Sequence, residues 1–169
     1  MDKKQSREYL KEVRSKILQK ATKDEQIKKR LLDFLALQYS DKKGLFIYES
    51  FGSEVATKNL IQEVATRYSV YVPEMTEGWK MHAKLLVDII GNLDVAQTNS
   101  QPDIAIVPLL GFTKDKHRIG YGKACYDRFF IHNPKMIKIG IAYDEQRHDF
   151  LPEIHDVPLD YIVTPTRIV

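Results

Sequence analysis

Residues 111–128, which read GFTKDKHRIGYGKACYDR, directly follow the most apolar run of the chain, residues 104–110. A buried strand that leads into a glycine-rich loop and then a helix presents backbone N–H groups and the positive end of the helix dipole to an anion. Basic side chains and an aspartate accompany the glycines here. The pattern therefore predicts a phosphate-binding turn, with the helix behind it at residues 122–131.

The glycine spacing of this turn matches neither of two common nucleotide-binding motifs. Gly120, Gly122 and Lys123 do not satisfy GxxxxGK[ST]. A GxGxxG motif would need glycine where Cys125 stands. A turn that only joins a strand to a helix, with no ligand, is the alternative interpretation, and the rest of the chain has to decide between the two.

The composition is that of an ordinary globular protein. The chain has 169 residues, of which 43% are hydrophobic and 29% charged, enough for one domain that buries about two-thirds of its unfolded surface. The first residues lack the apolar segment of a signal peptide and no later run reaches membrane-spanning length, so a cytoplasmic protein is expected. The single cysteine, Cys125, excludes an intrachain disulfide and a cysteine-based zinc site. We interpret it as a half-buried packing residue.

The net charge of +3 is unevenly distributed. Residues 1–30 carry eleven Lys and Arg against five Asp and Glu, which makes +6 for this segment and −3 for the remainder. Apolar residues at helical intervals predict amphipathic helices at residues 3–20 and 24–38. Lys3 and Arg7 lie four residues apart in the first helix and point the same way, so they form either a phosphate-binding pair or part of a solvated face.

A strand–helix–strand unit is predicted next, with the spacing of a parallel crossover. The strands are expected at residues 45–48 and 70–72, and the helix at residues 54–68. Glu49 and Glu54 fall where the first strand meets the helix, at the edge where open α/β sheets bind ligands. The alternative for Glu54 is that it stabilises the N-terminus of the helix through the helix dipole.

Residues 74–101 follow no clear hydrophobic period. Met75, Trp79 and Met81 bring large, soft side chains to this segment, and the ring of Trp79 either stacks on a flat ligand or covers the end of the sheet. Residues 84–90 fit a strand or a helix equally well, and residues 91–101 have the composition of a polar loop.

Three further strands are predicted at residues 103–108, 137–142 and 161–163. His148 and His155 have no partner with the spacing of a histidine pair on one face, so no histidine metal site is expected. No internal repeat and no long linker interrupts the chain, which favours one domain.

Four elements of the sequence together resemble the 5-formyltetrahydrofolate cyclo-ligase family, also called 5,10-methenyltetrahydrofolate synthetases. They are an N-terminal KxxxR helix, an SEVxT segment that begins a helix, the block VPLLGFxxxxxRIGYGxxxYDR, and the C-terminal IGIAYxxQxxxxLPxxHDVPLD. The resemblance covers essentially the whole chain in the family's order, and the central block and HDVPLD are its specific parts. It implies a single three-layer α/β domain over residues 1–169, with a mainly parallel, Rossmann-like sheet flanked by helices.

The functional residues of that family map onto this chain through the same motifs. The resemblance implies nucleotide binding by Lys3, Lys4, Gln5, Ser6, Arg7, Arg118, Ile119, Gly120, Tyr121, Gly122, Lys123, Ala124, Cys125 and Tyr126. It implies folate binding by Glu49, Glu54, Trp79, Met81, Tyr121, Gly122, Lys123, Ala124 and Cys125. Asp127 and Asp156 match the family's magnesium ligands. Catalytic roles are implied for Arg118, Lys123 and Tyr126.

Two positions depart from the family's usual sequence. Where the family commonly reads GYGGGYYDR, this chain reads GYGKACYDR, with Ala124 in place of a glycine and Cys125 in place of a tyrosine. The methyl group of Ala124 narrows the backbone conformations of the loop, and Cys125 removes a possible stacking partner. We expect these changes to affect loop closure and folate affinity.

The residue types suit the reaction that the resemblance implies. The γ-phosphoryl group of ATP would move to the formyl oxygen of 5-formyltetrahydrofolate, nitrogen 10 would attack the iminium phosphate, and phosphate would leave as the ring closes. Such a transfer needs positioning and charge neutralisation, for which the candidates are Lys3, Arg7, Arg118 and Lys123. Mg²⁺ prefers carboxylate, phosphate and water ligands, which suits two aspartates. No acid–base side chain is assigned.

Three other classes of function stay open at the level of sequence. An RNA-binding module would use the basic N-terminal segment, would lose affinity as salt rises, and would not need Mg²⁺. A nucleotide-dependent oxidoreductase lacks its glycine motif, and a phosphosugar isomerase would turn over without ATP. The expectation is a monomer that binds 5-formyltetrahydrofolate and ATP, and that binds neither nucleic acid nor membranes.

Overall fold

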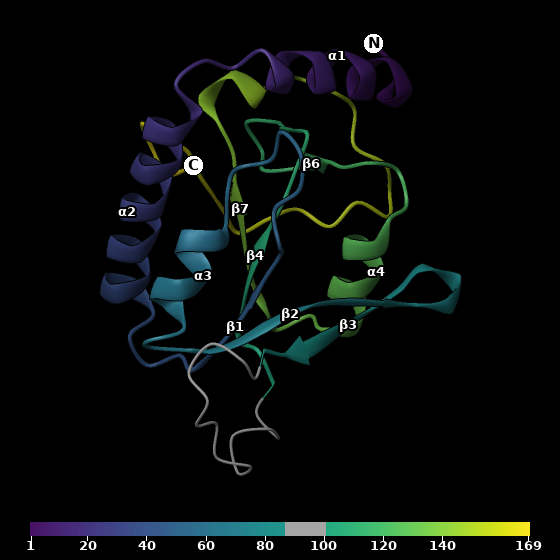
Figure 1. Cartoon of the computed structure of the whole chain (residues 1–169). Coiled ribbons are helices and arrows are strands. Elements are labelled where there is room, and N and C mark those ends of the chain that lie inside the picture. The colour runs from purple at the N-terminus through teal and green to yellow at the C-terminus, as the bar shows by residue number, and fades with distance from the viewer. Residues whose placement is uncertain (87–100) are drawn as a thin grey trace.

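A six-stranded sheet forms the centre of the protein (Figure 1). The computed structural model describes residues 1–86 and 101–169. Neighbouring strands are parallel throughout the order β3-β2-β1-β4-β7-β8, except that β3 runs antiparallel to β2. The strands are β1 (Gly44–Ile47), β2 (Ser69–Thr76), β3 (Lys80–Leu85), β4 (Ile104–Val107), β7 (Ile137–Ile141) and β8 (Tyr161–Val163).

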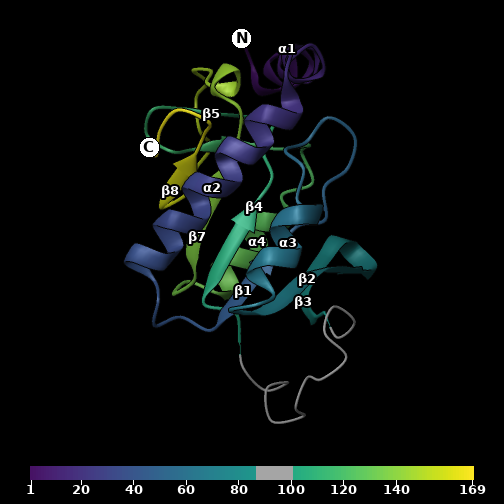
Figure 2. The same ribbon diagram turned by 60° about the vertical axis from the view of Figure 1, so that its left-hand side comes forward.

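Helices cover both faces of this sheet, which makes three layers. Figures 1 and 2 show α2 and α3 on one face and α4 on the other. The helices are α1 (Lys3–Ser15), α2 (Lys20–Gln38), α3 (Lys58–Val64) and α4 (Cys125–His132). Two 3-10 turns, η1 (Glu77–Trp79) and η3 (Asp144–Gln146), follow β2 and β7. The expected three-layer α/β fold with a mainly parallel sheet is confirmed.

Side chains alternate across the central strands, so both faces of the sheet are buried. Leu45 and Ile47 of β1 pack in the core beneath α2 and α3, whereas Phe46 packs in the core beneath α4. All three are fully buried, and each such side chain contributes roughly 1.5–3 kcal/mol relative to an exposed position. A continuous apolar run is therefore the signature of these strands, because neither face meets water.

The strand order contains a switch point between β1 and β4. From β1 the chain crosses to β2 on one side, and from β4 it crosses to β7 on the other. Connections that depart in opposite directions leave a crevice at the carboxyl ends of the two strands, where open α/β sheets bind their ligands. A ligand-binding site is therefore expected at the carboxyl ends of β1 and β4.

Helix α1 lies across this carboxyl-end edge rather than against a face of the sheet (Figure 1). Asp2 begins it with a capping box, in which its side chain accepts the Gln5 N–H at 2.7 Å and the Gln5 side chain accepts the Asp2 N–H at 3.1 Å. Leu10, in the middle of the helix, is fully buried against Gly111. A Cβ atom at Gly111 would stand 2.5 Å from Leu10 Cδ1, so any larger residue would force the Leu10 side chain to move.

A β-hairpin separates the central strand from the glycine-rich loop. Strands β5 (Gly111–Phe112) and β6 (Arg118–Ile119) pair antiparallel between β4 and α4. The prediction that the buried strand leads directly into the phosphate-binding turn was therefore wrong, because Gly111 belongs to the hairpin and the loop begins at Gly120. Helix α4 also begins at Cys125 rather than at Gly122.

Several predicted boundaries shift for local reasons. The helix expected from Glu54 begins at Lys58, because Ser50 and Thr57 exchange side-chain hydrogen bonds with each other's N–H groups at 2.8 and 3.0 Å and hold the preceding turn. Strand β2 continues past Pro73 to Thr76, because its antiparallel partner β3 extends the ladder. The first helix ends at Ser15 and the second begins at Lys20.

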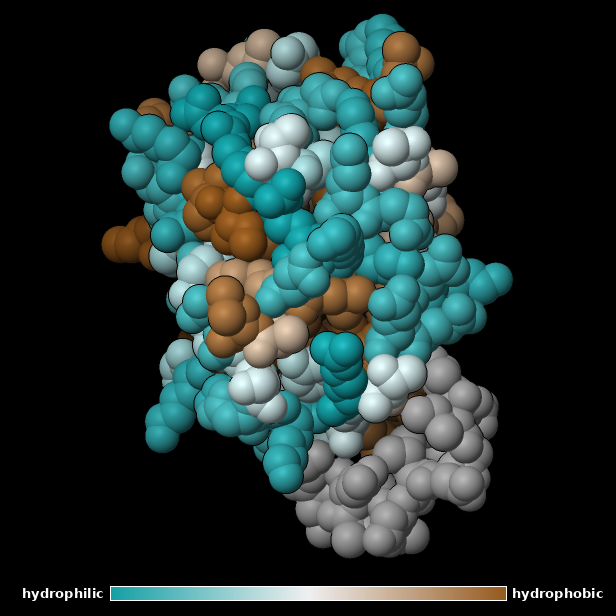
Figure 3. Space-filling view, turned by 90° about the vertical axis from the view of Figure 1, so that its left-hand side faces the viewer, coloured by the Kyte–Doolittle hydropathy of each residue, from teal (hydrophilic) through white to brown (hydrophobic). Residues whose placement is uncertain are grey.

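The structure describes part of the segment at residues 74–101, whose sequence follows no clear hydrophobic period. Residues 80–85 are the edge strand β3, so the first part of the predicted strand or helix at residues 84–90 is a strand. Residues 87–100, which include most of the predicted polar loop, lie outside the described residues. In the two described ranges no helix is long and apolar enough to cross a membrane. Figure 3 shows that the side on which α2 lies is mostly hydrophilic, with hydrophobic atoms gathered near its middle.

We expect Gly111→Ala to lower the free energy of unfolding by about 1–3 kcal/mol, because the new methyl group overpacks the contact with Leu10. Urea unfolding measures the change. In a Leu10→Ala background the neighbouring methyl groups are absent, so the same substitution should be less damaging. An equal loss in both backgrounds would mean that Leu10 does not set the distance between α1 and the hairpin.

Candidate functional site

A cavity of about 280 Å³ opens at the carboxyl-end edge of the sheet, beside the end of β4. Its walls come from α1, the β2–β3 hairpin, β6, the following loop, the start of α4 and a segment before β8. The lining residues are Lys3, Arg7, Met75, Trp79, Met81, Pro108, Leu109, Arg118, Ile119, Gly120, Tyr121, Gly122, Lys123, Ala124, Cys125, Tyr126, Asp127, Glu153 and Asp156.

The loop of residues 120–124 forms one wall of the cavity and is held by α1. Arg7 Nε donates a hydrogen bond to the Gly120 carbonyl at 3.0 Å. Gly122 has a φ of 95°, and a Cβ atom there would lie 3.3 Å from Arg7 Cζ. The backbone conformation therefore favours glycine at this position, and a side chain here would also press on the Arg7 guanidinium.

Ala124 at the end of this loop has a left-handed backbone, with a φ of 51° and a ψ of 22°. It occupies the N-cap position of α4, and no side-chain hydrogen bond caps the helix. The left-handed conformation costs an alanine about 1–2 kcal/mol, whereas glycine adopts it freely. Ala124 is therefore a strained residue at the junction of the loop and α4.

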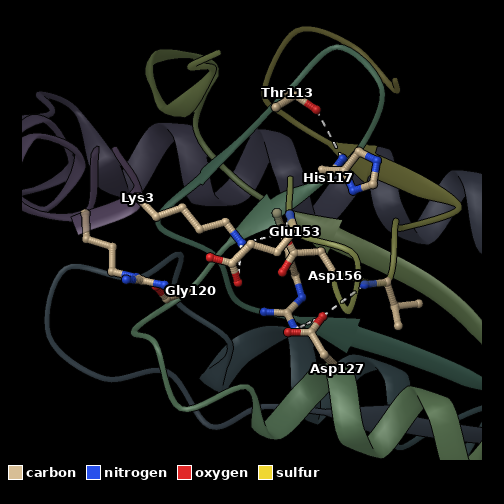
Figure 4. A network of polar contacts seen from close by, with 10 residues as sticks. Lys3, Thr113, His117, Gly120, Asp127, Glu153 and Asp156 are labelled. Carbon is tan, nitrogen blue, oxygen red and sulfur yellow. Dashed lines mark hydrogen bonds and ion pairs between the residues drawn. The ribbon is translucent and has the colours of Figure 1, made fainter. Parts of the chain in front are cut away.

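A cluster of opposite charges occupies the second wall. Figure 4 shows the Lys3 side chain reaching from α1 to Glu153 and Asp156. The Lys3 ammonium forms a close ion pair with Asp156 and lies 3.3 Å from Glu153 Oε2. Burial by itself raises the pKa of the Asp156 carboxyl, but the hydrogen bonds from Lys3 and from the Glu153 N–H outweigh it and hold that pKa below its ordinary value.

Arg118 and Asp127 form the other ion pair of the cavity. Arg118 Nη2 lies 3.0 Å from Asp127 Oδ1, and their side chains are only 6% and 16% exposed. The Arg118 guanidinium also lies over the Tyr126 ring, at 5.2 Å from its centroid. Burial raises the pKa of the Tyr126 phenol well above its ordinary value, although Arg118 opposes the rise, so this hydroxyl keeps its proton at neutral pH.

The two aspartates are suited to a magnesium ion that is bound together with phosphate. The ion-pair contacts engage Oδ1 of Asp127 and Oδ2 of Asp156. Mg²⁺ usually binds one or two carboxylates and takes phosphate and water as its other ligands. Over the described parts of the chain, no three His, Cys, Asp or Glu side chains gather into a metal-binding group. The residues therefore fit a shared ion and do not fit an all-protein metal cage.

Large, soft side chains make the remaining wall. Trp79 has a left-handed φ of 58° in η1 and is 54% exposed, and Met75 and Met81 flank it on β2 and β3. Lys123 Nζ lies 4.5 Å from the centroid of the Trp79 ring, a cation–π contact across the cavity. Arg128 Nη2 donates to the Trp79 carbonyl at 3.1 Å. An exposed aromatic ring held in this way offers a flat surface for stacking.

Most of the predicted site residues meet in this cavity, namely Lys3, Arg7, Trp79, Met81, Asp156 and the run from Arg118 to Asp127. Several others do not line it. Lys4 is exposed, Gln5 takes part in the helix cap, and Ser6 is buried with its hydroxyl 3.3 Å from His148 Nε2. Glu49 is exposed in a separate depression beside α3.

Glu54 also does not line the cavity, but its charge affects Tyr126, which does. The carboxylate accepts the Phe51 N–H at 2.8 Å in the loop before α3. Burial raises the pKa of Glu54, while the Phe51 N–H and the charge of Arg14 partly oppose that rise. Its own charge helps to raise the pKa of the Tyr126 phenol, so Glu54 is near enough to the cavity to affect groups there.

Several residues at the site were not assigned to it from the sequence: Met75, Pro108, Leu109 and Glu153 line the cavity, and Arg14 is bonded to Tyr121 behind its wall. Arg14 is buried at the end of α1, eleven residues after Lys3, and positions 3, 7, 10 and 14 lie along one face of a helix. That spacing is a signal that the sequence contains. Glu153 reaches Lys3 from an irregular segment, where no period marks the side chains that point into the cavity.

Comparisons with known proteins agree over nearly the whole chain. The model of the 5-formyltetrahydrofolate cyclo-ligase family matches residues 1–165. A 5-formyltetrahydrofolate cyclo-ligase of Mycoplasma pneumoniae is 30% identical over 151 residues, which make up 86% of this chain and 87% of that protein. A solved 5,10-methenyltetrahydrofolate synthetase from M. pneumoniae has a TM-score of 0.83 at 28% identity, over 98% of this chain and 99% of that one. The synthetase of Aquifex aeolicus, with a TM-score of 0.73 at 23% identity over 99% of this chain and 92% of its own, supports the fold.

We expect Ala124→Gly to raise the free energy of unfolding by about 1 kcal/mol, because it relieves the left-handed strain at the N-cap of α4. Urea unfolding provides the measurement. The matched control is Ala36→Gly in the exposed last turn of α2, where the same change should lower the free energy of unfolding by up to about 1 kcal/mol. A loss of stability at both positions would contradict a left-handed Ala124.

We expect Glu54→Gln to raise the thermal midpoint at pH 7.5 by a few degrees. Because burial lifts the pKa of Glu54 above its unfolded value of 4.5, the ionised carboxylate destabilises the fold at neutral pH, and this effect vanishes as the pH falls below 4.5. The gain should therefore disappear in acid. The control is Glu77→Gln on exposed η1, and a gain at Glu54 that persists at pH 4 would exclude ionisation as its cause.

Proposed function

The chain belongs to the 5-formyltetrahydrofolate cyclo-ligase family, and we propose that it activates its substrate by moving the γ-phosphoryl group of ATP onto the formyl oxygen. The activity of the family, EC 6.3.3.2, is the ATP-dependent conversion of 5-formyltetrahydrofolate to 5,10-methenyltetrahydrofolate. The observation that supports the proposal is a single cavity in which cations and carboxylates suited to ATP face a soft, aromatic wall suited to a folate ring.

The proposed activation solves a problem of leaving groups. The formyl group is an amide whose oxygen leaves poorly, so nitrogen 10 cannot displace it directly. When the formyl oxygen attacks the γ-phosphorus, the bond to the ADP oxygen breaks and an iminium phosphate forms. Nitrogen 10 then attacks the formyl carbon and loses its proton to solvent, and the carbon–oxygen bond breaks. The products are 5,10-methenyltetrahydrofolate, ADP and inorganic phosphate.

The phosphates of ATP would lie between α1 and the loop of residues 120–124. The cations available there are Lys3, Arg7, Arg118 and Lys123. Phosphoryl transfer needs in-line positioning and neutralisation of the equatorial oxygens more than it needs proton transfer. Arg118, whose charge is nearly removed from water, would act most strongly on the moving group, because an interaction with a preorganised buried charge is screened least. Lys123 and Tyr126 are the other proposed catalytic groups.

Asp127 and Asp156 would hold a magnesium ion that is also bound by the phosphates. Such an ion would neutralise the negative charge on the oxygens of the phosphoryl group that is transferred. The ion pair with Lys3 lowers the pKa of Asp156, and the ion pair with Arg118 holds the Asp127 side chain beside the cavity. This role uses carboxylates as ligands and asks no side chain to act as an acid or a base.

The folate would lie against the opposite wall. Trp79 and Met81 offer the surface on which a flat ring stacks, and Tyr121 extends it from the loop. Glu54 would accept hydrogen bonds from the pterin N–H groups, as the family resemblance implies, with Glu49 at the outer end of the same loop. Cys125 in place of tyrosine leaves this wall with one aromatic ring fewer. We further propose that the chain acts as one domain, as a monomer and in the cytoplasm.

The arrangement of α1 argues against the rival interpretation as an RNA-binding module. Lys3 and Arg7, part of the basic segment, point into the cavity and contact Asp156 and Gly120. Arg14 is buried. A nucleic-acid surface needs its cations exposed along the phosphate backbone, and here the three are turned inward.

The test is a spectrophotometric assay with 5-formyltetrahydrofolate, ATP and magnesium, each omitted in turn. We expect the near-ultraviolet band of the methenyl product to grow only in the complete mixture, with one ADP formed per product. Product formation without ATP, or without any divalent cation, would contradict the proposed activation.

The variant Asp127→Asn sharpens the same experiment. It keeps a hydrogen-bond acceptor for Arg118 but removes the charge, so we expect turnover to fall by about a hundredfold or more while the far-ultraviolet circular dichroism is unchanged. The matched control, Asp115→Asn, lies in the exposed turn of the β5–β6 hairpin and should behave as wild type. Near-normal turnover of Asp127→Asn would remove this residue from the metal site.

A further inference from the structure

Arg14 joins three separate segments at the edge of the sheet. The residue is only 3% exposed. Nη1 donates to the Leu109 carbonyl just after β4 at 3.0 Å, and Nε donates to Ser53 Oγ in the loop after β1 at 3.0 Å. Nη2 donates to the hydroxyl of Tyr121 in the loop before α4. One side chain thus connects α1 to the carboxyl ends of both strands at the switch point and to the glycine-rich wall of the cavity.

The charge of Arg14 is not explained by an ion pair. Its three contacts are a carbonyl and two hydroxyls, and among the described residues no carboxylate forms a salt bridge with it. Burying a cation with neutral partners is costly, because the lost hydration is not returned by an opposite charge. The charge of Arg14 lowers the pKa of Glu54, but burial raises that pKa by more. Fold stability alone therefore gives little reason for a charged group here.

Tyr121 is the partner through which Arg14 acts on the site. The tyrosine lines the cavity, is 51% exposed and follows Gly120 in a loop with two glycines. Arg14 makes two contacts with this side chain: it donates a hydrogen bond to the Tyr121 hydroxyl, and its guanidinium carbon lies 5.6 Å from the centroid of the Tyr121 ring. A second contact that ties the loop to α1 is the bond from Arg7 to the Gly120 carbonyl.

We infer that Arg14 is a positioning residue that fixes the loop of residues 120–124 across the cavity by holding Tyr121. The loop carries Lys123, whose ammonium lies over the Trp79 ring. The effect of Arg14 on catalysis rests on the proposed function, in which Lys123 lies between the two substrates. Arg14 itself does not line the cavity and touches no substrate. It joins the glycine-rich loop to Ser53, which directly precedes Glu54 in the loop after β1.

The first test is a double-mutant cycle on turnover with Arg14→Gln and Tyr121→Phe. Each single change removes the same bond, so we expect each to raise the KM for ATP and for 5-formyltetrahydrofolate by about tenfold, the factor that corresponds to about 1.4 kcal/mol. The double variant should be no worse than Arg14→Gln alone, because the two residues act through one contact. Fully additive effects would overturn the inference.

The second test reads the position of the loop without any substrate. Trypsin cleavage after Lys123 in the folded protein, followed by intact mass, should be about tenfold faster in both variants than in wild type. The matched control is Arg30→Gln, which removes a partly buried arginine bonded to the Pro165 carbonyl at 3.0 Å, far along the chain from the loop. We expect it to lower stability without speeding cleavage at Lys123.

The two tests separate this inference from the proposed function. Wild-type protein that makes no methenyl product would refute the proposed function, while the cleavage test would still report on the loop. An active wild type with unchanged cleavage in Tyr121→Phe would refute the role of Arg14. If Arg14→Gln fails to fold, Tyr121→Phe still decides the matter, because it removes the same bond at a half-exposed side chain.

Discussion

The docking of α1 across the carboxyl ends of the strands is the constraint on which the site depends. Leu10 packs directly on the β5–β6 hairpin because Gly111 has no side chain, and it shares a buried apolar cluster with Leu110, Ile119 and Phe150. A helix is rigid over three turns, so fixing its middle also fixes its cationic side chains at both ends. Lys3 and Arg7 can then reach groups that follow them by more than a hundred residues, Asp156 and Gly120.

The carboxylates that line the cavity are paired with cations before any substrate arrives. Lys3 is balanced by Asp156 and Glu153, and Arg118 by Asp127. In the proposed reaction these pairs are exchanged rather than created, since the cations turn to phosphate and the aspartates to the metal ion. Removing one partner of a buried pair is expensive, because the other charge is left in low dielectric. Mutual pairing therefore keeps the site assembled, and its side chains need little reorganisation when ATP enters.

Features that do not stabilise the fold gather beside this cavity. Ala124 has a left-handed backbone that suits glycine better, Trp79 has another, and Arg14 is a buried charge with neutral partners. Each of these costs free energy, and such costs persist where the surrounding structure enforces them, most often at functional sites. The glycine-rich loop that they surround is the part of the molecule where a small loss of restraint would move cavity-lining groups the furthest.

The sequence by itself determined the layers and most of the cavity's residues. Apolar runs such as residues 104–107 identify strands buried on both faces, and the glycine-rich loop with its aspartate identifies the family. Only the tertiary structure showed where the cations of α1 lie, because Lys3 and Arg7 line the cavity whereas Arg14 is buried behind Tyr121. It also decided that Glu49 lies apart from the cavity, that Glu153 lines it, and that Arg14 supports it from behind through Tyr121. Periodicity fixes which way side chains point within one helix or strand, whereas contacts between distant segments follow from docking, which local patterns do not encode.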